Sequence, residues 1–473
     1  MSKDSIHVVM VPWLAFGHLS PFLQLSIALA KEGVHVSFIS TPRNIKRLPK
    51  VPANLAPLVN LVEFPLPSLN NNLLPADAEA TFDLPTDKVQ YLTVAYDLLQ
   101  EPIRHFITRE RPDWIIVDFS PYWMAEIARD LDIPMIQFSM FTAAALQFFG
   151  QLDSGNDEIQ KESKPLHELL LSPPKCGDFQ STVAYRKYEV AELFATIAAE
   201  NASGKSSLER EGIVGNASRA MVLRTCTEFE SEYLVQPRNY TKPLIPVGLL
   251  LPDELPMEER NLAQEPWQKI SKWLNEQKPR SVVFVGFGSE CRFSKTQVYE
   301  IANGIQLSGL PFMWILQKPR WALNDIDALP SGFGAATDGR GLVHIGWAPQ
   351  KEILAHPAIG GSLFHAGWGS AIETLQYGHV LVVLPFVFDQ GLNARMLVEK
   401  GVAVEVKRNE EDGSFSGNDV ALSLREAMVL EEGEELRARA RKAVAIFGDR
   451  KLQDSYVKNF VEYLKNYRGT TSV

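Results

Sequence analysis

A glycine-rich segment in the second half of the chain carries residues suited to binding an anion. The apolar run 361–364 predicts a buried strand, His365–Gly369 predicts a turn, and Ser370–Gln376 predicts the start of a helix. Glycines let backbone amides approach an anion closely, and the N-terminus of a helix adds partial positive charge. A diphosphate is therefore the ligand that we expect here, with His365 and Ser370 as additional hydrogen-bond donors.

Residues on either side of this turn extend the expected ligand beyond its phosphates. Glu373 lies one turn into the predicted helix, where its carboxylate suits two ribose hydroxyls. Trp347 follows a separate strand and offers a flat face to a base. Asp389 and Gln390 follow the strand that ends near Pro385, where they suit sugar hydroxyls. Each residue alone is as typical of packing or a simple turn, but their combination indicates a nucleotide linked to a sugar.

A histidine and an aspartate in the first half suit proton transfer. His18 lies in a loop after the first predicted strand, and Pro21 suits the first turn of the next helix. Histidine is a suitable base near neutral pH. Asp118 ends the strand 114–118, where a carboxylate can fix the imidazole tautomer and stabilise the imidazolium. The alternatives are a structural His18 and an Asp118 that caps the helix 121–131, a role compatible with catalysis.

Elements that position these residues alternate between buried strands and helices. Continuous apolar runs are typical of parallel strands covered on both faces, and the alternation predicts βαβ units. Ligands of such sheets bind beyond the carboxyl ends of the strands. We expect strands at 6–12, 35–41, 114–119, 134–138 and 220–225 in the first half, and at 281–287, 312–317, 342–346, 361–364, 381–385 and 402–406 in the second.

The chain is expected to be an α/β protein with two Rossmann-like, doubly wound domains facing a cleft. A polar, proline-containing stretch separates the two series of strands, and a further polar segment, 153–175, is typical of a surface loop. The acidic-then-basic run 431–442 predicts a solvated helix with i,i+4 pairs. The expected parts are a first domain at 1–245, a linker at 246–266, a second domain at 267–450 and a helix at 451–473.

The segment from Trp347 to Gln390 resembles the 44-residue nucleotide-sugar box of the plant family 1 UDP-dependent glycosyltransferases. The resemblance runs over essentially the whole chain, from VPWLAFGHLSPFLQLS to the C-terminal helix. It implies the GT-B fold and an inverting transfer from a UDP-sugar. No DxD-type pair of carboxylates stands out to hold Mg²⁺ under the diphosphate, so we expect the transfer to be metal-independent. The UDP-sugar would be a donor co-substrate, and no prosthetic group is expected. His18 stands at the position of the family's catalytic histidine, with Asp118 as its partner.

The resemblance assigns the donor contacts residue by residue. Trp347 would stack on uracil with help from the backbone near Ala348, and Gln350 and Glu373 would bind the ribose. The remaining expected donor residues are His365, Gly367, Gly369 and Ser370 at the diphosphate, Ser289 beside the phosphates, and Trp368, Asp389 and Gln390 at the sugar.

Two positions depart from the commonest form of the box. Gly369 stands where asparagine is usual, and Ala366 stands where cysteine is usual. Together with LPFVFDQGLNAR, Gly369 resembles the branch that extends the sugar of flavonoid, diterpenoid and triterpenoid glycosides in plant secondary metabolism. Gln390 favours glucose as the donor sugar by the same resemblance, with rhamnose next.

The acceptor pocket is expected in the first domain. An apolar, aromatic lining suits a flat or polycyclic small molecule. Phe16 and Tyr122 lie in loops beside the catalytic candidates. Trp13 and Phe148 are further aromatic candidates of this domain, and the residues expected to contact the acceptor are Phe16, Phe119, Tyr122, Trp123 and Phe141.

Composition limits the partners and the compartment. The chain has 473 residues and a net charge of −10, which argues against nucleic-acid and anionic membrane partners. Its three cysteines lie far apart, so we expect reduced thiols and no zinc site. No run of 18 apolar residues is present, and we expect no signal peptide. We expect a cytoplasmic monomer whose partners are the UDP-sugar and a small-molecule acceptor.

Other functions compete with sugar transfer to a glycoside. An O-glucosyltransferase of the same family would act on the aglycone. A UDP-sugar epimerase on the GT-B scaffold would turn over its donor with no acceptor. A phosphorylase would need a lysine-bound pyridoxal phosphate, and no lysine stands out. A non-catalytic binder would not release UDP.

Overall fold

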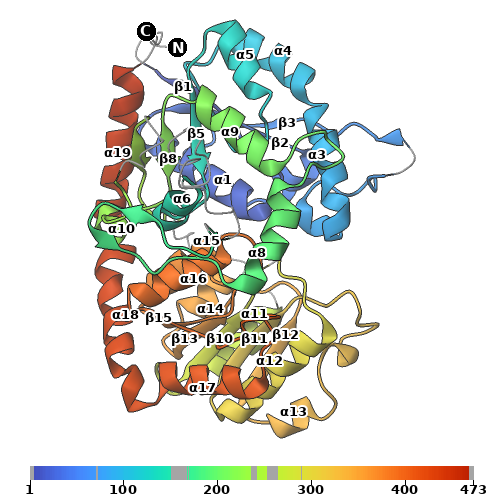
Figure 1. The fold of residues 1–473 in the computed structure, drawn as a ribbon, viewed down its shortest axis with the longest axis vertical. Helices are drawn as coiled ribbons and strands as arrows, with labels where there is room; N and C mark the ends of the chain where they lie inside the picture. Colours follow the sequence, from blue (N-terminus) through green and yellow to red (C-terminus); the bar gives the residue numbers. More distant parts are fainter. Residues whose placement is uncertain are drawn as a thin grey trace. The chain divides into compact units, whose positions relative to one another are not determined.

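The computed structural model describes residues 5–70, 73–150, 168, 170–235, 242–252, 265–288 and 290–467. The chain divides into two compact units (Figure 1). Unit 1 comprises Met1–Glu162, Leu193–Leu251 and Arg450–Val473, and unit 2 comprises Ser163–Glu192 and Pro252–Asp449. Among the described residues, no helix is long and apolar enough to cross a membrane.

Unit 1 is built on a seven-stranded parallel sheet with the strand order β3-β2-β1-β4-β5-β8-β9. The order reverses between β1 and β4, which pair in parallel with Val8 opposite Trp114. Such a switch point opens a crevice at the carboxyl ends of the two strands. The strands are β1 (His7–Val11), β2 (His35–Ser40), β3 (Val59–Glu63), β4 (Trp114–Val117), β5 (Met135–Ser139), β8 (Met221–Leu223) and β9 (Leu244–Pro246).

Helices cover both faces of this sheet because alternate strand residues point to opposite sides. In β1, Val8 and Met10 join one apolar cluster, and Val9 and Val11 join the other. The helices of unit 1 are α1 (Phe16–Lys31), α2 (Pro42–Arg47), α3 (Val89–Asp97), α4 (Gln100–Glu110), α5 (Met124–Leu131), α6 (Ala143–Gly150), α9 (Ser207–Ala217), α10 (Thr227–Glu230) and α19 (Arg450–Asn466). Short helical turns lie at Thr81–Asp83, Thr86–Lys88 and Phe194–Ala198.

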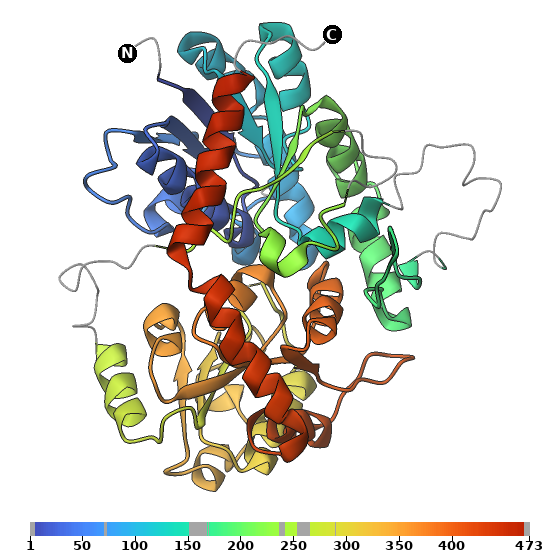
Figure 2. The same cartoon turned by 90° about the vertical axis from the view of Figure 1, so that its left-hand side faces the viewer.

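The C-terminal helix α19 packs on unit 1, where it is the red helix of Figure 2. The indole Nε1 of Trp114 donates to the carbonyl of Leu464 at 3.1 Å. The amide of Leu249 donates to Oε1 of Gln453 at 2.8 Å. The helix is therefore tied both to the central strand β4 and to the segment that follows β9.

Unit 2 contains a six-stranded parallel sheet with the order β12-β11-β10-β13-β14-β15. Its switch point lies between β10 and β13. The strands are β10 (Val282–Gly286), β11 (Phe312–Leu316), β12 (Gly341–Ile345), β13 (Ile359–Phe364), β14 (Val380–Val383) and β15 (Ala403–Glu405). Strands β6 (Lys175–Cys176) and β7 (Phe179–Gln180) form a separate antiparallel pair.

Helices also cover both faces of the unit 2 sheet. Val283 and Val285 pack in one apolar cluster, and Val282 and Phe284 pack in the other. The helices are α8 (Lys187–Leu193), α11 (Glu265–Asn275), α12 (Lys295–Ser308), α13 (Phe333–Ala336), α14 (Gln350–Leu354), α15 (Trp368–Leu375), α16 (Gln390–Glu399), α17 (Gly417–Met428) and α18 (Glu434–Phe447). Short turns lie at Ile326–Ala328 and Glu431–Gly433.

The α/β class expected from the sequence is confirmed, but two boundaries differ. Segment Ser163–Glu192, expected in the first domain, belongs to unit 2. Strand β9 lies partly within the expected linker and completes the sheet of unit 1. Both differences arise from tertiary contacts, namely buried ion pairs and an edge-strand pairing, that local composition does not encode. Residues 253–264 of the expected linker lie outside the described residues.

Candidate active site

A histidine and an aspartate meet at the switch point of unit 1. The Nδ1 of His18 lies 2.7 Å from Oδ2 of Asp118, and their side chains are 25% and 3% exposed. A carboxylate oxygen can only accept, so Nδ1 of His18 carries the proton of this contact. In the neutral tautomer that the contact favours, Nε2 is the ring nitrogen suited to accept a proton.

His18 lies in a different element from the one expected. Helix α1 begins at Phe16, so His18 stands in its first turn and its amide donates to the carbonyl of Ala15. Pro21 lies inside the helix and not at its start. The missing amide of Pro21 affects only the carbonyl of Gly17, and Gly17 is exposed to water. The helix can therefore extend back over His18.

Asp118 is fixed by backbone donors as well as by His18. The amide of Trp13 donates to Oδ2 at 2.9 Å, and the amide of Phe119 donates to Oδ1 at 2.8 Å. Helix α5 begins only at Met124, and its N-cap, Trp123, makes no side-chain cap hydrogen bond. The interpretation of Asp118 as a helix cap is thus wrong, and its contacts are with the loops after β1 and β4.

A buried ion pair that the sequence did not reveal supports the loop after β4. The side chain of Arg210 is 1% exposed, and its Nη1 donates to the carbonyl of Ser120 at 2.8 Å. The same nitrogen donates to Oδ1 of Asp97 at 2.9 Å. Because removing one partner of a buried pair leaves a costly unpaired charge, this pair anchors the backbone two residues beyond Asp118.

Three of the expected acceptor residues are partly exposed aromatic side chains of unit 1. Phe119 lies near His18, and Phe16 lies in the same first turn of α1 as His18. The ring of Phe119 lies 5.7 Å from the His18 ring, measured between centroids. Phe16 is partly exposed and packs at 5.3 Å against Phe82, a residue that the sequence did not single out. Phe141 is partly exposed and packs against Phe149 at 4.8 Å. The role of Phe16, Phe119 and Phe141 in binding the acceptor stays a prediction.

The other two acceptor candidates face the helices of unit 1. Trp123 is 2% exposed, and its Nε1 donates to Asp97 at 3.2 Å, so it is a core residue. The ring of Tyr122 lies 4.7 Å from the guanidinium of Arg210 and lines a hollow of about 890 Å³ between α5 and α9. The expectation that Tyr122 contacts the acceptor beside Asp118 has no support in these contacts.

Unit 2 brings together residues for a nucleoside at the end of β12. Trp347 is 62% exposed, so the face of its indole is open to a ligand. The Nε2 of His344 lies 2.8 Å from the carbonyl of Trp347 and fixes this turn. The Nε2 of Gln350 donates to Oε2 of Glu373 at 2.8 Å, which joins α14 to α15. The expected uracil and ribose residues therefore lie on adjoining elements, with Ala348 buried beneath them.

The turn after β13 holds a histidine with an unsatisfied nitrogen. Nδ1 of His365 is buried and has no hydrogen-bond partner within the described part of the chain. Burial lowers the pKa of His365 to about 4, so the ring is neutral at physiological pH. A Cβ on Gly367 would stand 2.4 Å from Nε2 of His365, and one on Gly288 would stand 3.1 Å from Cε1. Glycine is needed at both positions to admit the ring.

This turn leads directly into α15, whose N-cap is Gly367. Gly369 and Ser370 follow in the first turn of the helix, where amides point out of the helix end. A neutral imidazole, a hydroxyl and a helix N-terminus lie in one turn, which is the chemistry that a diphosphate needs, and their role at the diphosphate stays a prediction. Ser289 lies outside the described residues.

The sugar-binding candidates lie in the turn between β14 and α16. Nδ2 of Asn393 donates to Oδ2 of Asp389 at 2.7 Å and to the carbonyl of Ala366 at 3.2 Å. Asn393 thus links this turn to the diphosphate turn, and only its place in LNAR beside the box could have indicated it. Oε1 of Gln390 accepts from the amides of Phe386 and Val387, so this side chain also braces its own turn.

Trp368 does not present its ring to a ligand. Its indole is 5% exposed and packs edge-on against Phe447 of α18, with 6.2 Å between the ring centroids. The first turn of α15 directs this side chain into the core of unit 2. A contact between the Trp368 ring and the donor sugar is therefore not supported.

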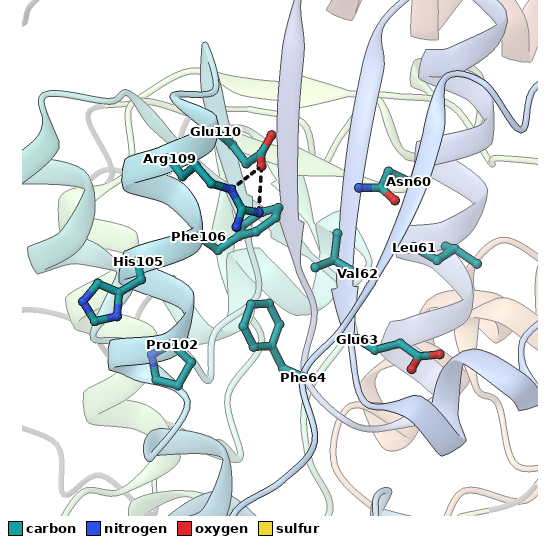
Figure 3. Close-up of a pocket in the computed structure, with 10 residues that line it drawn as sticks. All are labelled: Asn60, Leu61, Val62, Glu63, Phe64, Pro102, His105, Phe106, Arg109 and Glu110. Atoms are coloured by element: carbon teal, nitrogen blue, oxygen red, sulfur yellow. Dashed lines mark hydrogen bonds and ion pairs between the residues drawn. The ribbon is translucent and has the colours of Figure 1, made fainter.

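A second hollow in unit 1 is lined by none of the proposed site residues. It has a volume of about 550 Å³ and lies between the edge strand β3 and helix α4 (Figure 3). Phe64 and Phe106 meet edge-to-face in it, and His105 stands at its rim. Within the described ranges, no group of three or more His, Cys, Asp or Glu side chains is placed to hold a metal ion.

Two α/β units, each with a parallel sheet, define a glycosyltransferase of the GT-B class. One unit carries the His18–Asp118 pair, and the other carries the turn after β13 that suits a nucleotide-sugar. A solved UDP-glucosyltransferase from Polygonum tinctorium, capable of glucosylating indoxyl, has the same fold. Its TM-score is 0.78 at 23% sequence identity, over 98% of this chain and 100% of that chain.

Sequence comparison identifies the family. The family pattern described as UDP-glucoronosyl and UDP-glucosyl transferase matches residues 240–434, and that of the glycosyltransferase N-terminal domain matches residues 4–152. UDP-glycosyltransferase 91D2 of Stevia rebaudiana is 42% identical over 471 residues, covering 99% of this chain and 96% of the relative. Soyasaponin III rhamnosyltransferase of Glycine max is 39% identical over 468 residues, covering 98% of this chain and 96% of the relative. The chain belongs to the plant family 1 UDP-glycosyltransferases, so it is an enzyme with a UDP-sugar as donor co-substrate.

Proposed function

We propose that this enzyme transfers a hexose, glucose before rhamnose, to a hydroxyl on the sugar of a plant glycoside, with inversion at the anomeric carbon. The observation that carries the proposal is the 2.7 Å contact between His18 and Asp118, which orients the imidazole and favours the tautomer in which Nε2 can act as a base. Unit 1 supplies this base, and unit 2 supplies the groups suited to a UDP-sugar.

The proposed reaction is a single displacement. Nε2 of His18 takes the proton of the acceptor hydroxyl as the acceptor oxygen forms a bond to the anomeric carbon. The bond from that carbon to the phosphate oxygen breaks, and UDP leaves with the electron pair. Asp118 stabilises the imidazolium that forms. His365, Ser370 and the N-terminus of α15 stabilise the charge that develops on the diphosphate.

Support for a glycosylated acceptor comes from the sequence of the donor box and from a relative. Gly369 replaces the asparagine that is usual in the box, as in the branch that extends existing sugars. The soybean relative is named for rhamnosyl transfer to a saponin, and saponins are by definition glycosides. Rhamnose therefore stays beside glucose as a donor sugar, and flavonoid, diterpenoid and triterpenoid glycosides are the proposed acceptors.

A donor-by-acceptor screen tests this proposal. UDP-glucose, UDP-rhamnose, UDP-xylose and UDP-galactose are each combined with flavonoid, diterpenoid and triterpenoid compounds, as aglycones and as monoglucosides. UDP release and product mass are measured. We expect conversion of monoglucosides with UDP-glucose or UDP-rhamnose, with at least about tenfold higher kcat/KM than for the aglycones, because buried polar groups built for a substrate hydroxyl discriminate strongly against its absence. Preferred conversion of aglycones would contradict the acceptor class but not the enzyme class.

A further inference from the structure

Part of the first half of the sequence packs on the donor unit. Residues 182–190, here called the donor strap, belong to unit 2 with the box itself. The amide and hydroxyl of Thr182 contact Oε2 of Glu399 at 2.6 and 2.9 Å. The strap is thus joined to α16, the helix that begins at Gln390.

Tyr185 contacts the residue immediately before the proposed sugar ligands. Its side chain is 4% exposed, and its hydroxyl donates to the carbonyl of Phe388 at 3.1 Å. Phe388 has a φ of 50°, a left-handed conformation that is rare for a bulky residue. Burial raises the pKa of Tyr185 well above its usual value, so the phenol stays protonated and able to donate. This hydrogen bond holds the turn that presents Asp389.

Ion pairs hold the strap against α16 and β15. Nη1 and Nη2 of Arg395 in α16 donate to the carboxylate of Glu189, at 3.0 and 2.8 Å, and both side chains are nearly buried. Arg186 contacts Glu405 at 3.0 Å. A Cβ on Gly391 would stand 2.6 Å from Oε1 of Glu189, so the strap lies directly on the first turn of α16. Bidentate pairs of this kind fix geometry as well as adding energy.

We propose that Tyr185 is a positioning residue that sets the contact of Asp389 with the donor sugar and thereby the choice of donor. This inference rests on the proposed role of Asp389 as a sugar ligand. The hydrogen bond of Tyr185 is to the backbone of Phe388, one residue before Asp389. We therefore expect its loss to weaken binding of the donor sugar more than binding of the UDP moiety.

The experiment compares Tyr185→Phe with Tyr188→Phe in the full chain. The hydroxyl of Tyr188 is buried on the same strap and has no hydrogen-bond partner among the described residues, so its removal is a matched control. The readouts are KM for the best UDP-sugar, the inhibition constant of UDP, and the ratio of kcat/KM between UDP-glucose and UDP-xylose. Asp389→Asn is measured in parallel, with the melting temperature of each variant.

Tyr185→Phe should raise KM for the UDP-sugar about three- to tenfold and change the donor ratio, because one buried hydrogen bond is lost. The inhibition constant of UDP should stay within about twofold, and Tyr188→Phe should match the parent. Equal weakening of UDP and UDP-sugar, or a Tyr185→Phe variant that behaves like Tyr188→Phe, would overturn the inference. If Asp389→Asn leaves the donor ratio unchanged, the proposed ligand role itself fails, which is a separate result.

Discussion

Replacement of His18 by alanine is expected to lower kcat by about 10²- to 10⁴-fold, the usual contribution of a positioned general base. The acceptor hydroxyl then has no group to take its proton as the new bond forms. The affinity for UDP should not change, because the residues suited to UDP all lie in unit 2. Turnover is measured by UDP release, and UDP binding by calorimetry.

A second histidine of unit 1 provides the control for this prediction. His105 is exposed on α4 and lines the hollow beside β3, and the residues that line this hollow include none of the proposed site. His105→Ala should keep the parent kcat within about twofold, as for surface substitutions generally. A His18→Ala variant that retains near-native turnover would show that another group is the base.

Asp118→Asn is expected to lower kcat by about 10²- to 10⁴-fold, by analogy with the loss of the orienting carboxylate in a serine-protease triad. Asp118 accepts from His18, from the amide of Trp13 and from the amide of Phe119. Asparagine has one acceptor oxygen in place of two, so these donors can no longer all be satisfied. The amide also cannot stabilise an imidazolium by charge. KM for the UDP-sugar should change much less than kcat.

The matched control for this variant lies at the opposite end of the same strand. Oδ2 of Asp113 accepts from the amide of His7 at 2.8 Å, just before β4 begins. Asp113→Asn removes a comparable carboxylate without reaching the switch point, so activity per folded molecule should be kept. Steady-state kinetics and melting temperatures of both variants separate catalysis from folding. An equal loss of kcat in both variants would mean that Asp118 acts only through the stability of unit 1.

The fold was predictable from the sequence because its strands are buried on both faces. Runs such as those around Val8 and Val283 have the continuous apolar pattern of parallel strands, and both lie in central strands of the sheets. The two edge strands of unit 1 were missed: β3 carries exposed polar residues, and β9 is three residues long. The start of α1 was placed too late because Pro21 favours a first turn, whereas the helix tolerates it at an inner position.

The residues of the site were predictable to the extent that they follow strand ends. This holds for His18, Asp118, His365 and Asp389. In each unit, the parallel sheet brings the residues that follow its strands to one edge. The sequence could not show which way a side chain on a helix turn points, so Trp368 and Trp123 were expected at ligands and lie in cores.

The sequence also could not show the contacts that support the site between residues far apart in the chain. The pair between Arg210 and Asp97 and the bond from Tyr185 to Phe388 join residues that are remote in the chain. Nothing local marks them as partners.

The most direct test of the proposed displacement is the configuration of the product. Proton NMR of the glycoside formed from the preferred UDP-sugar gives the configuration at the new anomeric centre. Direct attack by a hydroxyl that His18 deprotonates requires the configuration opposite to that of the donor. The account predicts this inverted product. A product that retains the configuration of the donor would contradict it, because two successive displacements or a front-side attack would then be needed.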